Sequence, residues 1–308
     1  MTDEPMTGRE QPPSIDAGRG VAPDAAAVVI SYNVCGLLLA CIDSLRADGV
    51  EQIVVVDNAS SDRSVEAVRA HDPLVEVIAL DRNVGFAAAA NRGVARTTTP
   101  FVAVLNPDLL LDAPVCKVLV ETLERDTGLG LVGPLIRTPD GALYPSVRRF
   151  PDLVDAAGHA FLHFVWPMNP FSRRYRMLDW DHELPADVDW VAGTFMMARR
   201  EAWEEIGGFD EGFFMYLEDV DLCRRMHDAA WRVGYEPGAS VVHMIGCSTD
   251  QTPYRMIAIH HRSLWRYARK TTVGAKRLAL PLVGVALAVR VVLAWFQRAA
   301  RGRPHAAA

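Results

Sequence analysis

Four short apolar runs, separated by stretches with helical periodicity, constrain the fold of this chain more than any other feature. The runs are rich in valine, isoleucine or leucine and occupy residues 26–32, 52–56, 75–80 and 101–105. Between them, apolar side chains recur at helical spacing over residues 37–46, 63–70 and 86–95. Strands that are apolar throughout and alternate with helices typically form parallel sheets with both faces covered. The sequence therefore predicts an α/β fold with a mostly parallel sheet and helices on both faces.

Polar side chains follow each of the four predicted strands at the point where the strand ends. They are Ser31, Tyr32 and Asn33, then Asp57 and Asn58, then Asp81, Arg82 and Asn83, and finally Asn106 and Asp108. Ligands of open parallel sheets bind at the carboxyl ends of the strands. Any single Asn, Asp or Ser could equally be a turn or cap residue. Four strand ends together favour a ligand site, in which Asp108 is the candidate oxygen ligand of a divalent ion.

Two glycine-rich signatures of nucleotide binding are missing from the sequence. No G-x-G-x-x-G follows the first predicted strand, and no G-x-x-x-x-G-K-[ST] occurs. A nicotinamide or flavin dinucleotide is therefore not expected. Phosphate contacts must instead come from a metal ion or from side chains.

The candidate catalytic segment is residues 207–225, in which three acids follow a wall of large apolar side chains. Residues 213–216 are Phe, Phe, Met and Tyr, which neither helical nor strand periodicity can bury on one side. Some of them are therefore expected to line a cleft. A helix is expected to begin near Glu218, with Glu218, Asp219 and Asp221 in its first turn, where acids also simply complement the helix dipole. A partly desolvated carboxylate at a cleft wall is, in contrast, suited to accept a proton.

The pattern is less regular between residues 108 and 243. Residues 134–190 are dense in proline, arginine and aromatic residues, and we expect an excursion over the site instead of a second core. A strand is predicted at 189–198, a helix at 201–206, and short extended pieces at 232–235 and 240–243. A lone histidine is more often structural than a ligand. His243 is nevertheless a candidate metal ligand, because it ends a strand near the suspected metal site.

Cysteine usage and charge limit the compartment and the partners. Five cysteines without C-x-x-C spacing argue against a disulfide framework or a zinc site and predict buried thiols in a reducing compartment. Residues 1–24 are acidic and proline-containing, so we expect a disordered segment and not a secretory signal. The net charge is −6, but ten Lys and Arg without any acid follow from Arg262 onward. An acidic body with a basic tail argues against nucleic acid and favours an anionic membrane surface.

The last part of the chain, residues 251–308, is predicted to be a helical tail that associates with the membrane. Arg262, Arg266 and Arg269 with Lys270 recur at helical spacing and form a basic face. Residues 278–296 are almost wholly apolar apart from Arg290. A helix of this length reaches ~28 Å, close to the ~30 Å thickness of the hydrocarbon layer. The free-energy cost of inserting Arg290 into the bilayer nearly offsets the gain from the apolar side chains. The sequence is therefore compatible with a helix that spans the membrane and with one that lies in the membrane interface.

Taken in order, these motifs resemble the family 2 glycosyltransferases of the GT-A fold. More narrowly, they resemble bacterial rhamnosyltransferases that act on polyprenyl-diphosphate-linked N-acetylglucosamine (GlcNAc). The similarity covers about residues 26–250, and its most specific pieces are residues 31–33, 56–62, 83–86, 91–93, 105–108, 207–210 and 216–222. It implies a Rossmann-like GT-A domain at 25–250, with a donor half at about 25–110 and an acceptor half at about 111–250.

The resemblance also implies roles for the candidate residues. At the donor site it places Ser31, Tyr32, Asn33, Asp57 and Asn58 around a pyrimidine nucleoside, with Arg82, Asn83 and Asn106 beside the donor. Asp108 corresponds to the second acid of the family's D-x-D metal motif, and Asn106 stands where many relatives have the first. His243 is implied as a further ligand of Mg²⁺ or Mn²⁺, and Asp219 as the catalytic base. Glu218, next to Asp219, is the second candidate catalytic residue, which would position the acceptor.

The implied reaction is an inverting sugar transfer from a nucleotide-diphosphate donor, dTDP-L-rhamnose, to a lipid-linked acceptor on the cytoplasmic face of the membrane. Two alternatives stay open. Another donor, such as UDP-galactofuranose, would leave the reaction class unchanged. Alternatively, the Asn at position 106 could have removed the metal and left a nucleotide-sugar-binding protein without catalysis.

Overall fold

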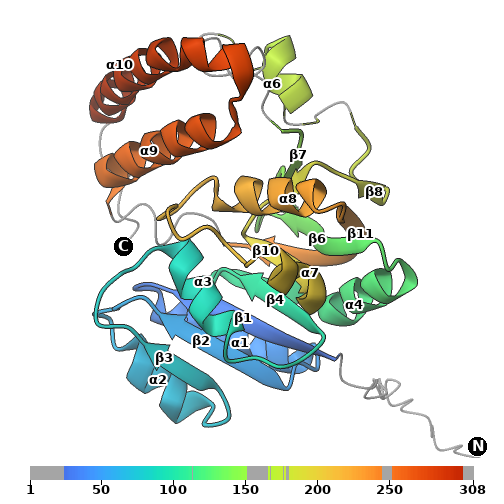
Figure 1. The fold of residues 1–308 in the computed structure, drawn as a ribbon. Coiled ribbons are helices and arrows are strands. Elements are labelled where there is room, and N and C mark those ends of the chain that lie inside the picture. Colours follow the sequence, from blue (N-terminus) through green and yellow to red (C-terminus); the bar gives the residue numbers. More distant parts are fainter. Residues whose placement is uncertain are drawn as a thin grey trace, which may run out of the picture.

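The protein folds around one mixed sheet in a computed structural model that describes residues 24–112, 114–150, 166, 168–175, 177, 180–244 and 252–300. The predicted disordered segment 1–24 lies outside the described residues except for Asp24. Figure 1 shows the sheet in the lower and middle part of the molecule, with helices in front and behind, and two long helices stacked above it. The order of the sheet is β3 (Glu76–Ala79), β2 (Gln52–Asp57), β1 (Ala25–Ser31), β4 (Phe101–Leu105), β10 (Phe195–Arg199), β6 (Leu129–Arg137), β11 (Arg232–His243) and β5 (Leu109–Asp112), and β8 (Ala186–Asp187) pairs with β11.

The first half of the sheet has the predicted parallel arrangement. Its elements are β1 (Ala25–Ser31), α1 (Cys35–Ala47), β2 (Gln52–Asp57), α2 (Ser64–His71), β3 (Glu76–Ala79), α3 (Phe86–Val94) and β4 (Phe101–Leu105). Strand β1 pairs in parallel with β2 and β4, and β2 pairs in parallel with β3. The apolar runs therefore predict these strands correctly, to within a few residues.

The second half of the sheet is mixed, which the sequence pattern did not predict. Its elements are β5 (Leu109–Asp112), α4 (Val115–Arg125), β6 (Leu129–Arg137), β10 (Phe195–Arg199), α7 (Arg200–Glu205), α8 (Glu218–Asp228) and β11 (Arg232–His243). Strand β10 is antiparallel to both β4 and β6, whereas β11 is parallel to β6 and antiparallel to β5. The expected parallel arrangement thus holds up to β4, and long-range antiparallel pairs extend the sheet beyond it.

Three local predictions need correction. The two extended pieces at 232–235 and 240–243 are one strand, β11, with an irregularity between Glu236 and Ser240. The strand expected at 189–198 is divided into β9 (Trp190–Val191) and β10. Within the expected excursion at 134–190, residues up to Arg137 belong to the central strand β6, while β7 (Val147–Arg148), α6 (Pro170–Tyr175) and β8 (Ala186–Asp187) are short.

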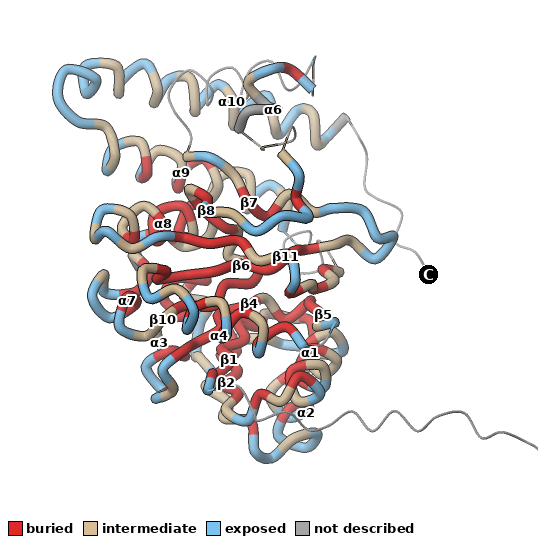
Figure 2. The backbone as a smooth tube through the Cα atoms, turned by 90° about the vertical axis from the view of Figure 1, so that its right-hand side faces the viewer, coloured by how far each residue is buried: buried red, intermediate tan, exposed pale blue. Residues whose placement is uncertain are grey.

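Two apolar cores cover the two faces of the sheet, because successive strand residues point to opposite sides. Val28 and Ile30 of β1 pack with residues of α3, α7 and α8 on one face. Ala27 and Val29 pack with residues of α1, α2 and α4 on the other. Figure 2 shows these strands as the most buried part of the molecule. Both faces are therefore covered, as predicted.

The tail forms a helical hairpin of α9 (Pro253–Thr271), a 3₁₀ turn η2 (Gly274–Ala279) and α10 (Leu280–Ala300). The Trp295 indole N–H, late in α10, donates to the carbonyl of Tyr254, early in α9, at 3.2 Å, so the helices are antiparallel. Residues Gly274–Ala299 are long and apolar enough to cross a membrane, and an 18-residue window within them has a mean hydropathy of 2.2. Their apolar side chains lie on the outside of the molecule, where α10 is drawn as intermediate and exposed (Figure 2).

Candidate active site

The ends of β1 and β2 bring two buried polar residues together. The strand register sets Ser31 opposite Asp57, and both residues are buried. One Asp57 oxygen accepts the Ser60 N–H at 2.8 Å. The other, Oδ2, and the Ser31 hydroxyl have no hydrogen-bond partner among the described residues. A buried polar atom without a partner costs roughly 1–3 kcal/mol, so these two oxygens are suited to a polar ligand.

Asn33 ties the loop after β1 to the loop after β2. Its backbone N–H donates to the Ser60 hydroxyl at 2.9 Å, and its side-chain oxygen accepts the Ser61 N–H at 2.7 Å. Asn33 itself has φ +53°, which asparagine tolerates better than most residues. Tyr32 beside it is half-buried. Hydrogen bonds of Asn33 therefore link the two loops that follow the strand ends predicted to bind the nucleoside.

Asn58 and Asn83 shape the loop that precedes α3. The Asn58 amide donates to the carbonyl of Gly85 at 3.1 Å and accepts the Val84 N–H at 2.9 Å. The Asn83 side chain accepts the Gly85 N–H at 3.0 Å. Arg82 on the same loop is exposed. The hydrogen bonds assign Asn58 and Asn83 to positioning this loop, and their contact with a donor stays a prediction.

Gly85 joins this loop to the candidate catalytic segment. It has φ +89°, and a Cβ at this position would lie 2.2 Å from the carbonyl oxygen of Phe214. The next residue, Phe86, donates its N–H to the same oxygen at 2.7 Å. Only glycine allows this approach without strain. The donor half and the acceptor half therefore meet at Gly85 and Phe214.

Asp108 and His243 lie side by side although they are far apart in the sequence. Asp108 follows β4, and its carbonyl accepts the N–H of Met244 at 2.9 Å, at the end of β11. Asp108 Oδ1 lies 3.3 Å from His243 Nε2, and both side chains are buried. Apart from that contact, Asp108 Oδ1 and His243 Nδ1 have no partner among the described residues. An unpaired carboxylate oxygen beside an imidazole is a donor set that fits Mg²⁺ or Mn²⁺.

This pair alone does not make a closed metal site. The part of the chain that the structure describes contains no group of three or more His, Cys, Asp or Glu residues that could hold an ion. Asn106, half-buried, adds a neutral amide two residues before Asp108. Mg²⁺ and Mn²⁺ commonly take their remaining ligands from substrate phosphates and water. The arrangement is therefore suited to an ion that arrives with a diphosphate.

A short backbone path connects Asp219 to the loop that carries Asp108. Its two oxygens accept the N–H groups of Gly193 at 3.0 Å and Val220 at 2.8 Å. Thr194, which follows Gly193, accepts the N–H of Asn106 at 2.9 Å. Two hydrogen bonds thus connect Asp219 to the loop that carries Asp108, and their membership of one site stays a prediction. The sequence pattern missed the role of Gly193 and Thr194, although a glycine inside an apolar strand does mark a bend.

Strained backbone precedes α8. Tyr216 and Leu217 have φ +67° and +66°, a conformation that costs about 1–3 kcal/mol at each non-glycine residue and concentrates at functional sites. Helix α9 supports this turn, because the Ser263 hydroxyl donates to the Met215 carbonyl at 2.8 Å. The His260 ring packs edge-on against Tyr216 at 5.2 Å. The tail helix therefore helps to orient the acids of α8.

Glu218 and Asp219 have different surroundings. Glu218 is buried, and its burial together with the neighbouring Asp219 charge raises its pKa well above the ordinary value. Burial also raises the pKa of Asp219, but the N–H groups of Gly193 and Val220 oppose this effect. Two adjacent carboxyl groups in unlike environments mark separate roles. Glu218 is suited to retain its proton, and Asp219 to carry the negative charge.

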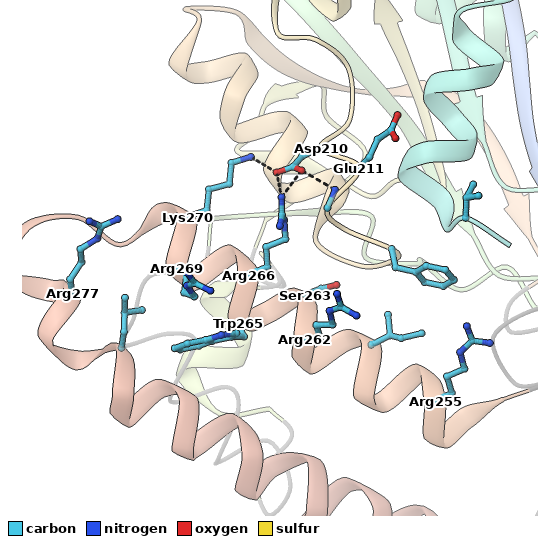
Figure 3. A pocket seen from close by; sticks show the side chains of 15 residues that line it. Asp210, Glu211, Arg255, Arg262, Ser263, Trp265, Arg266, Arg269, Lys270 and Arg277 are labelled. Carbon is cyan, nitrogen blue, oxygen red and sulfur yellow. Dashed lines mark hydrogen bonds and ion pairs between the residues drawn. The ribbon is translucent and has the colours of Figure 1, made fainter. Parts of the chain in front are cut away.

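The third acid, Asp221, is structural. It forms an i,i+4 pair with Arg225 at 2.8 Å and a second pair with Lys270 of α9 at 2.7 Å. Asp210 pairs with Arg266 at 2.7 Å and with Lys270 at 2.8 Å. The predicted basic face is therefore wrong for Arg266 and Lys270, which are turned toward the domain (Figure 3).

Replacing Asp210 by Asn should loosen α9 from the domain. Burial opposes ionisation of Asp210, but hydrogen bonds from Lys270, Gly212 and Arg266 lower its pKa to about 2. We expect Asp210→Asn to lower the free energy of unfolding by roughly 1 kcal/mol at pH 7, because the pairs are partly exposed and screened. The native pKa lies below the ordinary 3.8, so this contribution is complete above pH 3.8 and is lost toward pH 2. Urea unfolding of both proteins between pH 7 and pH 2 measures it; a difference that stays constant down to pH 2 would contradict the assignment.

Comparison with known proteins agrees with this geometry. The sequence profile of Glycosyl transferase family 2 matches residues 26–207. The chain is 35% identical over 235 residues to the N-acetylglucosaminyl-diphospho-decaprenol L-rhamnosyltransferase of Mycobacterium tuberculosis, which covers 72% of this chain and 76% of that protein. It is 28% identical over 178 residues to rhamnosyltransferase WbbL of Escherichia coli K12, over 58% of this chain and 64% of that protein.

Solved structures share the fold at low sequence identity. The mannosyltransferase PcManGT of Pyrobaculum calidifontis, in complex with GDP-Man and Mn²⁺, matches with a TM-score of 0.55 and 18% identity over 92% of this chain and 77% of that one. GalNAc-T7 with UDP, GalNAc and Mn²⁺ matches with a TM-score of 0.57 and 16% identity, over 79% of this chain and 48% of that one. The fold, the family profile and the 35% identical relative together show that this chain is a GT-A glycosyltransferase that belongs to family 2.

Proposed function

We propose that this enzyme transfers L-rhamnose, with inversion, from dTDP-rhamnose to GlcNAc carried on a polyprenyl diphosphate, in the synthesis of a cell-wall or surface polysaccharide. The related proteins from M. tuberculosis and E. coli are rhamnosyltransferases by name, and the name of the first gives N-acetylglucosaminyl-diphospho-decaprenol as its acceptor. The observation that supports the proposal is the backbone path that connects Asp219, through Gly193 and Thr194, to Asn106 and so to the loop of the Asp108–His243 pair. From this path we infer that the proposed base and the proposed diphosphate site lie at opposite ends of one reacting centre.

The donor is expected to bind at the ends of β1 and β2. The unpaired oxygens of Ser31 and Asp57 offer two acceptors, or one donor and one acceptor, to a pyrimidine nucleoside. Arg82 is exposed on the adjacent loop and can reach an anionic group as a bidentate donor. These contacts select a nucleotide and leave the identity of the sugar to the rest of the cleft.

Asp108 and His243 are the residues that would hold Mg²⁺ or Mn²⁺. Such an ion supplies charge neutralisation for the departing diphosphate. Asp108 contributes a full negative charge and His243 a neutral nitrogen, while Asn106 contributes no charge at all. The protein therefore brings less negative charge than a pair of aspartates would, and metal affinity is expected to depend on the donor diphosphate.

Asp219 is the proposed base. An inverting transfer needs one carboxylate that takes the proton of the acceptor hydroxyl as the new bond forms. The pKa of Asp219, raised by burial, makes it a stronger base than an exposed aspartate. The N–H groups of Gly193 and Val220 fix its orientation, so that little reorganisation is needed during the reaction.

We place the enzyme at the cytoplasmic face of the membrane. A polyprenyl acceptor keeps its lipid in the bilayer and presents only its diphosphate sugar. The exposed apolar side chains of α10 provide a means of attachment. The cysteines that the structure describes are free thiols, which suits a reducing compartment.

A donor screen tests the proposal. Purified full-length protein is incubated with dTDP-rhamnose, UDP-galactofuranose and other nucleotide sugars, each with polyprenyl-diphosphate-GlcNAc, with and without EDTA. We expect product from dTDP-rhamnose, with inverted configuration and sensitivity to EDTA. Preference for another donor would reject rhamnose but keep the reaction class, and donor binding without any turnover would indicate a binding protein.

The metal pair makes a separate prediction. Asp108→Ala and His243→Ala should each raise the Mg²⁺ or Mn²⁺ concentration needed for half-maximal activity at least tenfold, because each removes a proposed ligand. The matched controls are Asp43→Ala and His71→Ala, which break an exposed Asp–His pair at 2.6 Å on α1 and α2 and should change nothing. Metal titration of turnover measures the effect. An unchanged metal dependence in both site variants would mean that no ion binds there.

A further inference from the structure

A basic groove runs along α9 beside the catalytic segment. It has a volume of about 1170 Å³ and lies between residues 210–214 and the α9–α10 hairpin (Figure 3). We call it the α9 groove. Its lining residues are Val84, Asp210, Glu211, Gly212, Phe214, Arg255, Ile259, Arg262, Ser263, Trp265, Arg266, Arg269, Lys270, Arg277 and Leu280.

The α9 groove has an excess of positive charge. Six of its lining residues are Arg or Lys and two are acids. Arg266 and Lys270 are paired with Asp210, and Glu211 accepts a hydrogen bond from Asn91 at 3.1 Å. The four remaining cations are Arg255, Arg262, Arg269 and Arg277. None of them forms an ion pair with a carboxylate in the described part of the chain.

Two of these arginines are held over aromatic rings. The Arg255 guanidinium lies 5.6 Å from the centre of the Phe214 ring, and that of Arg269 lies 6.0 Å from the centre of the Trp265 ring. A guanidinium that stacks on a ring keeps its N–H edges available for an anion. Ring stacking therefore orders these side chains in the free protein without using their hydrogen-bonding capacity. Arginine also binds phosphate oxygens in a bidentate manner that lysine cannot match.

The two ends of the groove have different characters. At one end Val84 and Phe214 belong to the junction of the donor and acceptor halves, and the segment from Phe214 leads directly to Asp219. At the other end Arg277 and Leu280 belong to the start of the apolar hairpin helix α10. Beyond Leu280, the side chains of Leu282 and Val285 are exposed. A ligand that fits both ends has an anionic part in the groove, a sugar at the end that leads to Asp219 and a lipid at the end formed by α10.

We propose that the α9 groove binds the diphosphate of the lipid-linked acceptor. This inference rests on the proposed function and adds the subsite that recognises the acceptor. The four arginines, Arg255, Arg262, Arg269 and Arg277, exceed in number the two negative charges of a diphosphate diester. The headgroups of anionic lipids carry the same phosphate chemistry. The groove is concave, however, and residues 210–214 close one side of it, which favours a single acceptor molecule that enters the groove and not a flat membrane surface that covers it.

The test compares two soluble acceptors with one embedded in vesicles. The soluble acceptors carry GlcNAc on the same short alkyl chain, one through a diphosphate and one through a neutral linkage; the third is polyprenyl-diphosphate-GlcNAc in neutral vesicles. The test protein is the full chain with Arg262→Gln and Arg269→Gln. The matched control carries Arg69→Gln and Lys117→Gln, which remove two exposed charges from α2 and α4. Thermal unfolding checks that all three proteins are folded.

We expect the wild type to favour the soluble diphosphate acceptor over the neutral one. The groove variant should raise the KM for the diphosphate acceptor at least tenfold, with the KM values for the donor and the neutral acceptor within twofold of wild type. The control should match the wild type throughout. Arg255→Gln with Arg277→Gln provides a second variant, for which the same loss is expected.

Other outcomes would overturn the inference in distinguishable ways. Wild-type KM values in the groove variant would show that the arginines do not contact the diphosphate. A loss confined to the vesicle acceptor would assign them to the membrane surface. An equal loss on both soluble acceptors would assign them to the catalytic segment. Absence of transfer to any acceptor by the wild type would reject the proposed function itself, and the inference with it.

Discussion

Asp219→Asn should lower turnover at least 100-fold while leaving donor affinity near the wild-type value. The side chain keeps its size, and its one amide oxygen can still accept the N–H of Gly193, observed at 3.0 Å, at the expense of the hydrogen bond from Val220; the site should therefore largely keep its shape. What is lost is the ability to take a proton, and general-base catalysis typically contributes 10²–10⁴-fold. The measurements are single-turnover rates with saturating acceptor, and donor binding by calorimetry. Turnover within threefold of wild type would remove Asp219 from the role of base.

Glu218→Gln is the matched control for this prediction. Glu218 is adjacent, buried and held toward its protonated form by burial and by the Asp219 charge. Because a neutral glutamine resembles a protonated glutamate, we expect a milder effect than that of Asp219→Asn. The reverse ranking would assign the role of base to Glu218.

The pH dependence of turnover follows from the same pair. The base must be ionised, and burial raises the pKa of Asp219 above its ordinary value of 3.8. Activity should therefore be retained at high pH and fall as the pH drops through this raised pKa. An acid limb that lies at or below the ordinary aspartate pKa would disagree with the buried setting of this residue.

The sequence predicts the donor half of the fold well, because the signals there are local. Strands β1, β2 and β4 are continuous apolar runs. Strand β1 pairs in parallel with β2, which it reaches through the single helix α1, and also with β4, which follows β3 and α3 in the chain. Parallel pairing with helical crossovers brings all their carboxyl ends to one edge. The sequence therefore predicts that Ser31, Asp57 and Asp108 lie at one edge of the sheet, and the structure sets Ser31 opposite Asp57; their common site stays a prediction.

The acceptor half was not predictable in the same way. Strand β10 enters the sheet between β4 and β6, antiparallel to both, and no local pattern in residues 195–199 specifies those partners. The Gly193–Thr194 turn that joins Asp219 to Asn106 depends on this insertion. The resemblance to a known family supplied the role of Asp219, whereas periodicity alone predicted only an acidic helix start.

The tail shows how tertiary contacts override a helical pattern. Arg262, Arg266 and Lys270 look equivalent on a helical projection, but Arg266 and Lys270 pair with Asp210 of the catalytic segment. Gly212 allows this, because a Cβ there would lie 2.0 Å from the Arg266 guanidinium carbon. Helix α9 is therefore bound to the domain by ion pairs, and α10 is the part left with its apolar side chains outward.

Truncation after Thr271 removes η2 and α10 but keeps α9, and it should separate folding from membrane attachment. The two cores of the domain contain no residue of α10, so the truncated protein should fold and bind nucleotide. As a control, a truncation that also removes α9 deletes the partners of Asp210 and Met215. We expect that shorter protein to lose activity on soluble and lipid-linked acceptors alike.

The effect of losing α10 on membrane binding should be large. Eight large apolar side chains of η2 and α10 are exposed, from Leu278 to Phe296, and fully burying one contributes roughly 1.5–3 kcal/mol. Even half of the summed contribution of these eight side chains exceeds the summed contribution of Arg255, Arg262 and Arg269, which have no carboxylate partner in the described part of the chain and contribute ~1 kcal/mol each near an anionic surface. The full chain should therefore stay bound to anionic vesicles as salt is raised, whereas the truncated chain should bind only at low salt.

Activity should follow the same division. We expect the truncated chain to lose at least 100-fold in kcat/KM on vesicle-embedded polyprenyl-diphosphate-GlcNAc, because the enzyme no longer remains at the surface that carries its acceptor. On the short-chain soluble diphosphate acceptor the loss should stay within tenfold, since among the unpaired groove cations only Arg277 is removed. Vesicle flotation at two salt concentrations and parallel kinetics on both acceptors measure these effects. Equal loss on the two acceptors would show that α10 supports the fold of the catalytic domain and not its attachment to the membrane.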